Sequence, residues 1–117
     1  MREILFRGKD VGGNWHYGVP LVFTEDYICM TAPYTYNKAI IPDTVGQYTG
    51  MHDNNGTRIF EGDIVECAGE DELLKVEWCE DTARFKLSAS TFCCDFDNYW
   101  GYEIEVIGNI HDNPELL

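Results

Sequence analysis

Basic residues are scarce in this chain of 117 residues. Lys and Arg number 8 against 21 Asp and Glu, which gives a formal net charge of −13 at pH 7. Binding to a phosphate backbone requires many Lys and Arg side chains. The sequence therefore predicts no direct nucleic-acid binding, and its negative charge favours basic partners.

Long hydrophobic runs are missing as well. No apolar stretch approaches the roughly 20 residues of a membrane-spanning helix. Charged residues interrupt the N-terminal segment MREILFRGKD before any export signal forms. We therefore expect no membrane segment and a cytoplasmic location.

Paired cysteine and histidine ligands are also absent. The five cysteines include the direct neighbours Cys93 and Cys94, whose side chains would point to opposite faces of a strand. Zinc sites instead use two pairs of ligands, each pair only a few residues apart. The sequence predicts buried free thiols in a reducing compartment, with no metal or other cofactor.

Motifs for nucleophilic catalysis and nucleotide binding do not occur: there is no G-x-S-x-G, no P-loop and no G-x-G-x-x-G. The pairs Glu61–Asp63 and Glu103–Glu105 have a spacing that suits acid–base chemistry. Alternating carboxylates on a solvated strand explain them as well. We expect a protein that is not an enzyme, with a metal-dependent or hydrolytic enzyme as the alternative.

What the chain does contain is period-two alternation of apolar and polar residues, which is typical of β-strands. Every second residue from Trp15 to Phe23 is apolar, which predicts one wholly apolar strand face, and Pro20 predicts a sheet edge or a bulge. No window has a helical period, and only one turn, capped by Asp43, is predicted near 43–45. Further predicted buried positions are Val76, Trp78, Phe85, Leu87, Ile104, Val106, Ile107 and Ile110.

The segment Val45–Glu66, VGQYTGMHDNNGTRIFEGDIVE, combines a turn with the start of a strand. Asp53-Asn54-Asn55-Gly56 tolerates positive φ and predicts a hairpin, whereas a calcium loop would need a closing Glu that is missing. Gly62 is predicted to have a positive φ, just before Asp63, whose carboxylate is expected to accept backbone N–H groups.

Negative charge is concentrated in the second half. Residues 1–58 hold six acids and five bases, whereas residues 59–117 hold fifteen acids and three bases. The candidate partner-binding residues are acidic side chains after the strand near 66 and aromatic side chains in turn-rich segments: Tyr48, Glu70, Asp71, Glu72, Tyr99, Trp100 and Tyr102. The alternatives are a merely solvated acidic face and aromatic residues that cap the ends of a barrel.

Several short motifs extend over nearly the whole chain: Arg2-Glu3, Phe6-Arg7-Gly8, Trp15 with Tyr17-Gly18, Val45 to Gly50, Asp53 with Asn55-Gly56, Ile59 to Val65, Glu105 to Ile110, and Asn113 to Leu116. Together they resemble the YopX family of small proteins from bacterial phages and prophages. The resemblance implies a mostly β protein whose C-terminal part is an SH3-like barrel. It implies no activity and no catalytic residues.

We therefore predict an N-terminal β-hairpin layer (residues 1–42) packed with a C-terminal SH3-like barrel (residues 43–117), with little or no helix. The expected role is a non-enzymatic module that binds a host or phage protein, preferably a basic one, in the bacterial cytoplasm. A narrower hypothesis is that the acidic surface mimics nucleic acid. The structural alternative is self-assembly into a homo-oligomer through a sheet edge near Pro20.

Overall fold

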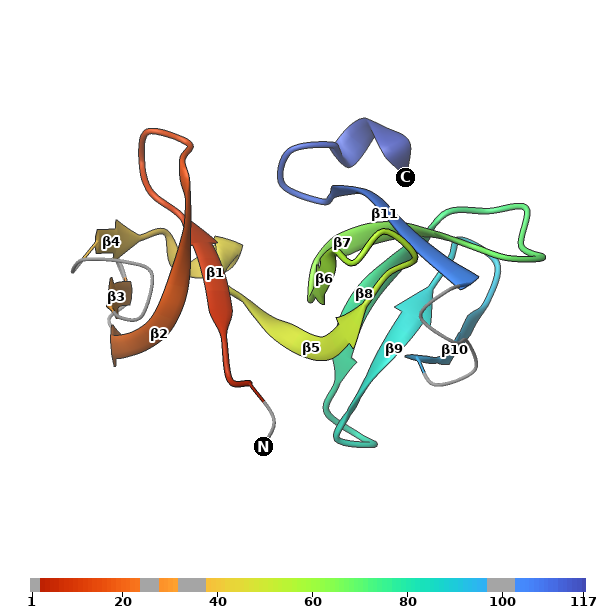
Figure 1. Cartoon of the computed structure of the whole chain (residues 1–117), viewed down its shortest axis with the longest axis horizontal. Coiled ribbons are helices and arrows are strands. Elements are labelled where there is room, and N and C mark those ends of the chain that lie inside the picture. The colour runs from red at the N-terminus through yellow and green to blue at the C-terminus, as the bar shows by residue number, and fades with distance from the viewer. Residues whose placement is uncertain (1–2, 24–27, 32–37, 97–102) are drawn as a thin grey trace. The chain divides into compact units, whose positions relative to one another are not determined.

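The computed structural model describes residues 3–23, 28–31, 38–96 and 103–117, with the backbone alone for 21–23, 28–31 and 38. The described chain is mostly β and forms two antiparallel sheets (Figure 1). It contains no α-helix, only short 3₁₀ turns such as η1 (Pro42–Thr44) and η4 (Pro114–Leu116). By compactness the chain divides into Met1–Tyr48 and Thr49–Leu117, a boundary six residues later than the predicted one after residue 42.

The N-terminal unit contains strands hydrogen-bonded in the order β4-β3-β2-β1-β5. Their bounds are β1 (Phe6–Lys9), β2 (Trp15–Phe23), β3 (Ile28–Thr31), β4 (Lys38–Ile40) and β5 (Gly46–His52). Asp10 shapes the turn between β1 and β2, because its Oδ1 accepts the backbone N–H groups of Gly12 and Asn14 at 2.9 and 3.0 Å. Ile40 is buried against Phe6 and Val45 and forms a small core.

One prediction for this unit needs correction at β2. The strand lies between β1 and β3, so Pro20 is not at a sheet edge, but the pairing register shifts between Pro20 and Val22. The register shift agrees with the predicted bulge and the predicted edge is wrong, so self-assembly stays a prediction that would need another edge of the sheet. The apolar face of β2 includes Tyr17, which is 37% exposed.

The single turn predicted near 43–45 exists as η1, but Asp43 does not cap it. No side chain caps its N-terminus, where the cap position is occupied by Ile41. Thr44 stabilises the turn instead, since its hydroxyl donates to the Ile41 carbonyl at 2.7 Å and accepts the Lys9 N–H at 2.8 Å.

In the C-terminal unit, β5 continues and pairs with β6 (Arg58–Phe60). A five-stranded sheet follows in the order β10-β9-β8-β7-β11. Its strands are β7 (Asp63–Cys67), β8 (Leu74–Cys79), β9 (Arg84–Ser88), β10 (Cys93–Asp95) and β11 (Ile104–Asn109). The core is formed by Ile59, Val65, Cys67, Leu74, Val76, Leu87, Phe96 and Ile104.

The alternation pattern predicts eight buried positions, of which three are fully buried, three (Phe85, Val106 and Ile110) are partly exposed and two are exposed. Val76, Leu87 and Ile104 are fully buried, as expected. Trp78 is 42% exposed, because it lies near the end of β8, next to the turn that leads to β9. Ile107 is 38% exposed, because it sits at the register shift that separates Val106 from Gly108 in β11.

The predicted hairpin and strand entry are confirmed. The turn between β5 and β6 has Gly56 at φ 81°, and Gly62 has φ 92° before β7. Asp63 is 1% exposed, and its Oδ2 accepts the Phe60 N–H at 2.7 Å. Because this carboxylate serves the backbone, Glu61 and Asp63 do not form an exposed acid–base pair.

The cysteines with described side chains are free, but only Cys67 is buried. Cys79 and Cys94 are partly exposed and Cys93 is exposed, so the prediction of burial is wrong for Cys93. No helix in the described part of the chain has the length and apolar character needed to cross a membrane.

Candidate functional site

The predicted partner-binding residues have different environments. Tyr48 belongs to the N-terminal unit and is buried, so its side chain offers little surface to a partner. Glu70, Asp71 and Glu72 lie in the loop between β7 and β8, where Asp71 is exposed and the two glutamates are partly exposed. The other three predicted residues, Tyr99, Trp100 and Tyr102, fall outside the described residues.

Glu72 is held in place beside a surface pocket. The hydroxyl of Ser90 donates a hydrogen bond to one oxygen of its carboxylate, and the hydroxyl of Thr91 donates to the other. These two bonds, the one from Ser90 first, lower the pKa of Glu72 below its ordinary value. Sequence reasoning missed both hydroxyl groups, because they come from the segment after β9.

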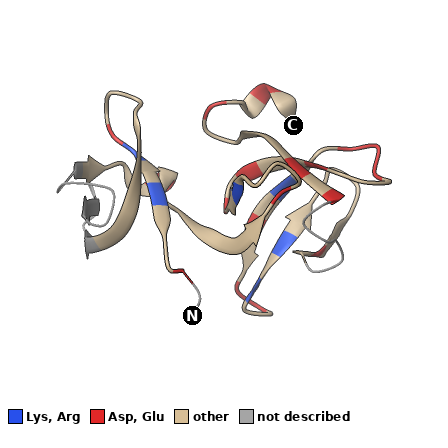
Figure 2. Ribbon diagram, viewed as in Figure 1, with Lys and Arg blue, Asp and Glu red and all other residues tan. Residues whose placement is uncertain are grey.

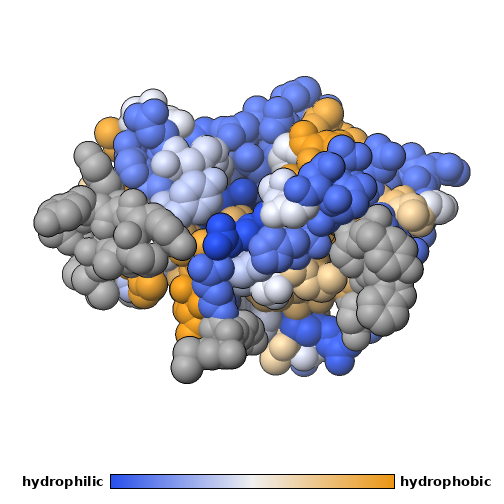
Figure 3. Space-filling model, in the orientation of Figure 1, coloured by the Kyte–Doolittle hydropathy of each residue, from blue (hydrophilic) through white to orange (hydrophobic). Residues whose placement is uncertain are grey.

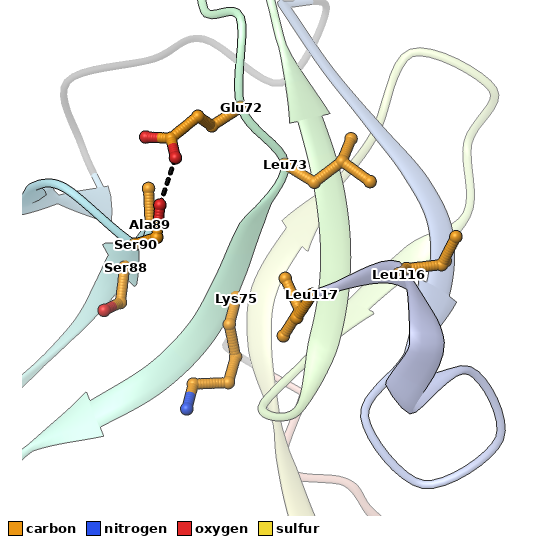
Figure 4. Close-up of a pocket in the computed structure, with 8 residues that line it drawn as sticks. All are labelled: Glu72, Leu73, Lys75, Ser88, Ala89, Ser90, Leu116 and Leu117. Carbon is orange, nitrogen blue, oxygen red and sulfur yellow. Dashed lines mark hydrogen bonds between the residues drawn. The ribbon is translucent and has the colours of Figure 1, made fainter.

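The pocket beside Glu72 has a volume of about 400 Å³ (Figure 4). Leu73, just before β8, and the leucines at the C-terminus line one part of it, and Glu72 and Lys75 bring charges of opposite sign to the rest. The full lining is Glu72, Leu73, Lys75, Ser88, Ala89, Ser90, Leu116 and Leu117.

A second feature is a like-charge pair on the β7–β11 ladder. Glu66 lies directly opposite Glu105, and both side chains are exposed. Burial raises the pKa of the neighbouring Cys67 thiol to about 12, and the nearby groups Cys94, Glu70, Glu103 and Glu66 add to the effect in that order. Like charges directly opposite on paired strands destabilise the pairing.

The basic side chains of β8 and β9 do not neutralise that pair. Lys75 and Lys86 both bind Glu77, with N–O distances of 3.4 and 3.7 Å, and Arg84 binds Asp95 at 3.1 Å. These are the three Lys and Arg residues between positions 59 and 117. In Figure 2 the acidic segments of the C-terminal unit, in red, are more widespread than its basic segments, in blue.

A third feature is an aromatic pair at the turn end of the β8–β9 hairpin. Trp78 lies opposite Phe85, with ring centroids 5.1 Å apart and an interplanar angle of 73°. A hollow of about 380 Å³ lies beside the pair and is lined by Thr82, Ala83, Arg84, Phe85 and Phe96. The sequence pattern places Trp78 in the core and therefore does not predict this surface. Figure 3 shows separate apolar patches on a mostly hydrophilic surface.

The described residues contain no candidate metal site. No group of three or more His, Cys, Asp or Glu residues there could hold a metal ion.

A family model described as YopX protein matches residues 6–117. The chain belongs to the YopX family. The resemblance inferred from its motifs is thereby confirmed, and it covers nearly the whole chain.

Among solved structures, the YopX-family chain is similar to the crystal structure of protein EF1440 from Enterococcus faecalis. The TM-score is 0.65 and the sequence identity 23%, with 100% of this chain and 99% of that chain covered. At this identity the likeness shows a shared fold and no more. No curated protein matches the chain.

Proposed function

We propose that this YopX-family chain is a non-enzymatic interaction module that binds a basic protein through its acidic C-terminal unit. The observation that carries the proposal is the exposed pair Glu66–Glu105 on a ladder whose nearby bases are already bound to other carboxylates. A cationic side chain from a partner relieves the repulsion between the two glutamates. Attraction of this kind weakens as salt screens it.

We infer further that the C-terminal unit is an SH3-like barrel. Two hydrogen bonds that join the β5–β6 turn to β11 support this inference. The Asn54 N–H donates to the Ile104 carbonyl at 2.9 Å, and the Val106 N–H donates to Asp53 Oδ2 at 2.9 Å. These bonds cover part of the outer edge of β11, so a partner binds through side-chain charge rather than by adding a strand there.

The family resemblance also supports a phage or prophage as the source of the gene and the bacterial cytoplasm as the place of action. The partner is then a host protein or another phage protein. Its defining property in this proposal is a basic surface, since charge complementarity selects it.

The test is retention of proteins from bacterial lysate on the immobilised chain at low and at high salt. We expect a discrete basic protein that is retained at low salt and released at high salt. The variant Glu66→Gln/Glu105→Gln should lose it. The matched control Asp112→Asn/Glu115→Gln removes the same charge from exposed residues near the C-terminus and should retain it.

Absence of any salt-sensitive protein would contradict the proposal. Equal loss in both double variants would show that total charge, and not this face, attracts the partner.

A narrower form of the proposal is mimicry of nucleic acid by the acidic loop. Neutralising it as Glu70→Gln/Asp71→Asn/Glu72→Gln should then abolish binding of a nucleic-acid-binding host protein. Unchanged binding by this triple variant would rule out the loop as the mimic.

A further inference from the structure

The aromatic pair at the end of the β8–β9 hairpin is an exposed continuation of the core. On the same strand faces, Val76 and its partner Leu87 are fully buried. One step further, Trp78 is 42% exposed although its ring packs edge-on against Phe85. Trp is the side chain with the largest apolar surface and is enriched at binding hot spots. Its exposure next to the core therefore marks a candidate contact point.

A hollow adjoins this pair through Phe85, although Trp78 itself does not line it. Phe85 belongs to both features, since it packs on Trp78 and also lines the hollow. Phe96, which is 7% exposed, is another aromatic wall. A volume of about 380 Å³ is enough for one long side chain of a partner, because ligand pockets begin at roughly 300 Å³.

Charge around the hairpin end favours a cation in this place. Glu80 and Asp81 are exposed in the turn that joins β8 to β9, which is red in Figure 2. The strands themselves add two carboxylates and three bases that bind one another: Glu77 with Lys75 and Lys86, and Asp95 with Arg84. The bases are therefore bound to Glu77 and Asp95, and these residues together have a net charge of −1 that lies at the turn carboxylates Glu80 and Asp81.

We propose that the hairpin end binds an arginine side chain of the basic partner, with its guanidinium on the exposed indole of Trp78 and the adjoining part of the partner segment over the hollow. The inference rests on the proposed function and names the place of contact. Arginine is favoured over lysine, because its planar guanidinium stacks on aromatic rings and is more weakly hydrated. The carboxylates of Glu80 and Asp81 complement its charge.

The test uses two synthetic peptides of equal length and charge, one alternating Arg and Gly and one alternating Lys and Gly. Their affinities for the full chain are measured by calorimetry at low salt. We expect tighter binding of the Arg peptide. Trp78→Ala should weaken that binding by about fivefold, in line with one cation–π contact, and should change binding of the Lys peptide less.

Tyr17→Ala is the matched control, because Tyr17 is an exposed aromatic residue of the N-terminal unit, and its loss should leave both affinities unchanged. Circular dichroism checks that each variant is folded. Two milder variants test the same site without removing the ring's packing: Trp78→Phe should retain part of the Arg preference, and Glu80→Gln/Asp81→Asn should weaken binding of both peptides.

Equal affinity for the two peptides, or unchanged Arg binding in Trp78→Ala, would overturn this inference. Salt-sensitive binding that persists in that variant and is lost in Glu66→Gln/Glu105→Gln would leave the proposed function standing. Failure of both peptides to bind the unmodified chain would count against both proposals. A concentration-dependent dimer that Trp78→Ala abolishes in sedimentation would show that a second copy covers the surface.

Discussion

Asp53 joins two parts of the C-terminal unit with one carboxylate. Its Oδ1 accepts the N–H groups of Asn55 and Thr57, both at 2.9 Å, and its Oδ2 accepts that of Val106 at 2.9 Å. Burial acts to raise the pKa of Asp53, but these hydrogen bonds outweigh it and the net pKa lies below the ordinary value. The ionised form is therefore the one that stabilises the fold.

Asp53→Asn should lower the free energy of unfolding by about 2 kcal/mol, the loss expected for hydrogen bonds to a charged group. Because the pKa is lower in the folded state than in the unfolded state, the stabilisation is complete above about pH 4 and is lost as the pH falls further. Urea unfolding at neutral and acidic pH measures both effects.

The control for that experiment is Asp71→Asn, an exposed carboxylate of the loop before β8. It should change stability little at either pH. A difference between Asp53→Asn and the unmodified chain that stays constant down to pH 2 would show that the carboxylate's charge contributes nothing.

Strands β8 and β9 show how one face of a hairpin changes environment along its length. The pair Val76–Leu87 is buried in the core, and the next pair on that face, Trp78–Phe85, is partly exposed. The same side chain alternation therefore yields core packing at one end and a surface at the other. Removing a side chain should have different consequences at the two ends.

Leu87→Ala should cost about 2–5 kcal/mol of stability, because it leaves an enclosed cavity. Trp78→Ala should cost less than about 3 kcal/mol, the lower limit for a fully buried Trp, because water can fill the space it leaves. Urea unfolding of both variants checks this order, and a larger loss for Trp78→Ala would mean that the ring is buried in solution.

Strands β7 and β11 carry the like-charge pair Glu66–Glu105. Replacing either residue by Gln removes the repulsion, so each single variant should raise the free energy of unfolding by a few tenths of a kcal/mol, within the range of about 0.2–1 kcal/mol for cross-strand pairs. The double variant should gain little more than one single variant. Additive gains in this double-mutant cycle would show that the two charges do not interact.

Over the whole molecule, the net charge of −13 opposes the compact state. Added NaCl screens this repulsion, so the thermal midpoint at pH 7 should rise by about 3–5 °C between low and moderate salt, which corresponds to about 1 kcal/mol. Differential scanning calorimetry measures the shift. Near the isoelectric point of about 4.3 the effect should vanish, and an equal rise there would point to general salt effects.

Local features of the chain were predictable because they depend on neighbouring residues. The turn at Asp53–Gly56 follows from residues that tolerate positive φ, and Gly62 precedes a strand as expected. Family membership was predictable too, from short motifs spread along the chain. Of the site, the sequence predicts the acidic residues of the loop before β8 as partner-binding, whereas it offers Glu105 only as part of an acid–base pair and Trp78 only as a core residue.

Contacts between distant segments could not be read in this way. Val106 meets Asp53 across 53 positions, and Ser90 meets Glu72 across 18. The sequence does not indicate either donor, because almost every residue has a backbone N–H and a single serine belongs to no recognisable motif. Pro20 gave a signal that suits both an edge and a bulge, and only the pairing with β3 distinguished them.

The amino-acid order by itself determined a β protein with an acidic second half. Alternation is visible within short segments, and the charge of each half is a sum over its residues. Tertiary structure alone decided which apolar faces reach the core and which stop short of it, as at Trp78. It also decided that two glutamates lie opposite each other while the nearby bases bind elsewhere. Strand register and order set these neighbours, and both depend on pairing between segments far apart in the chain.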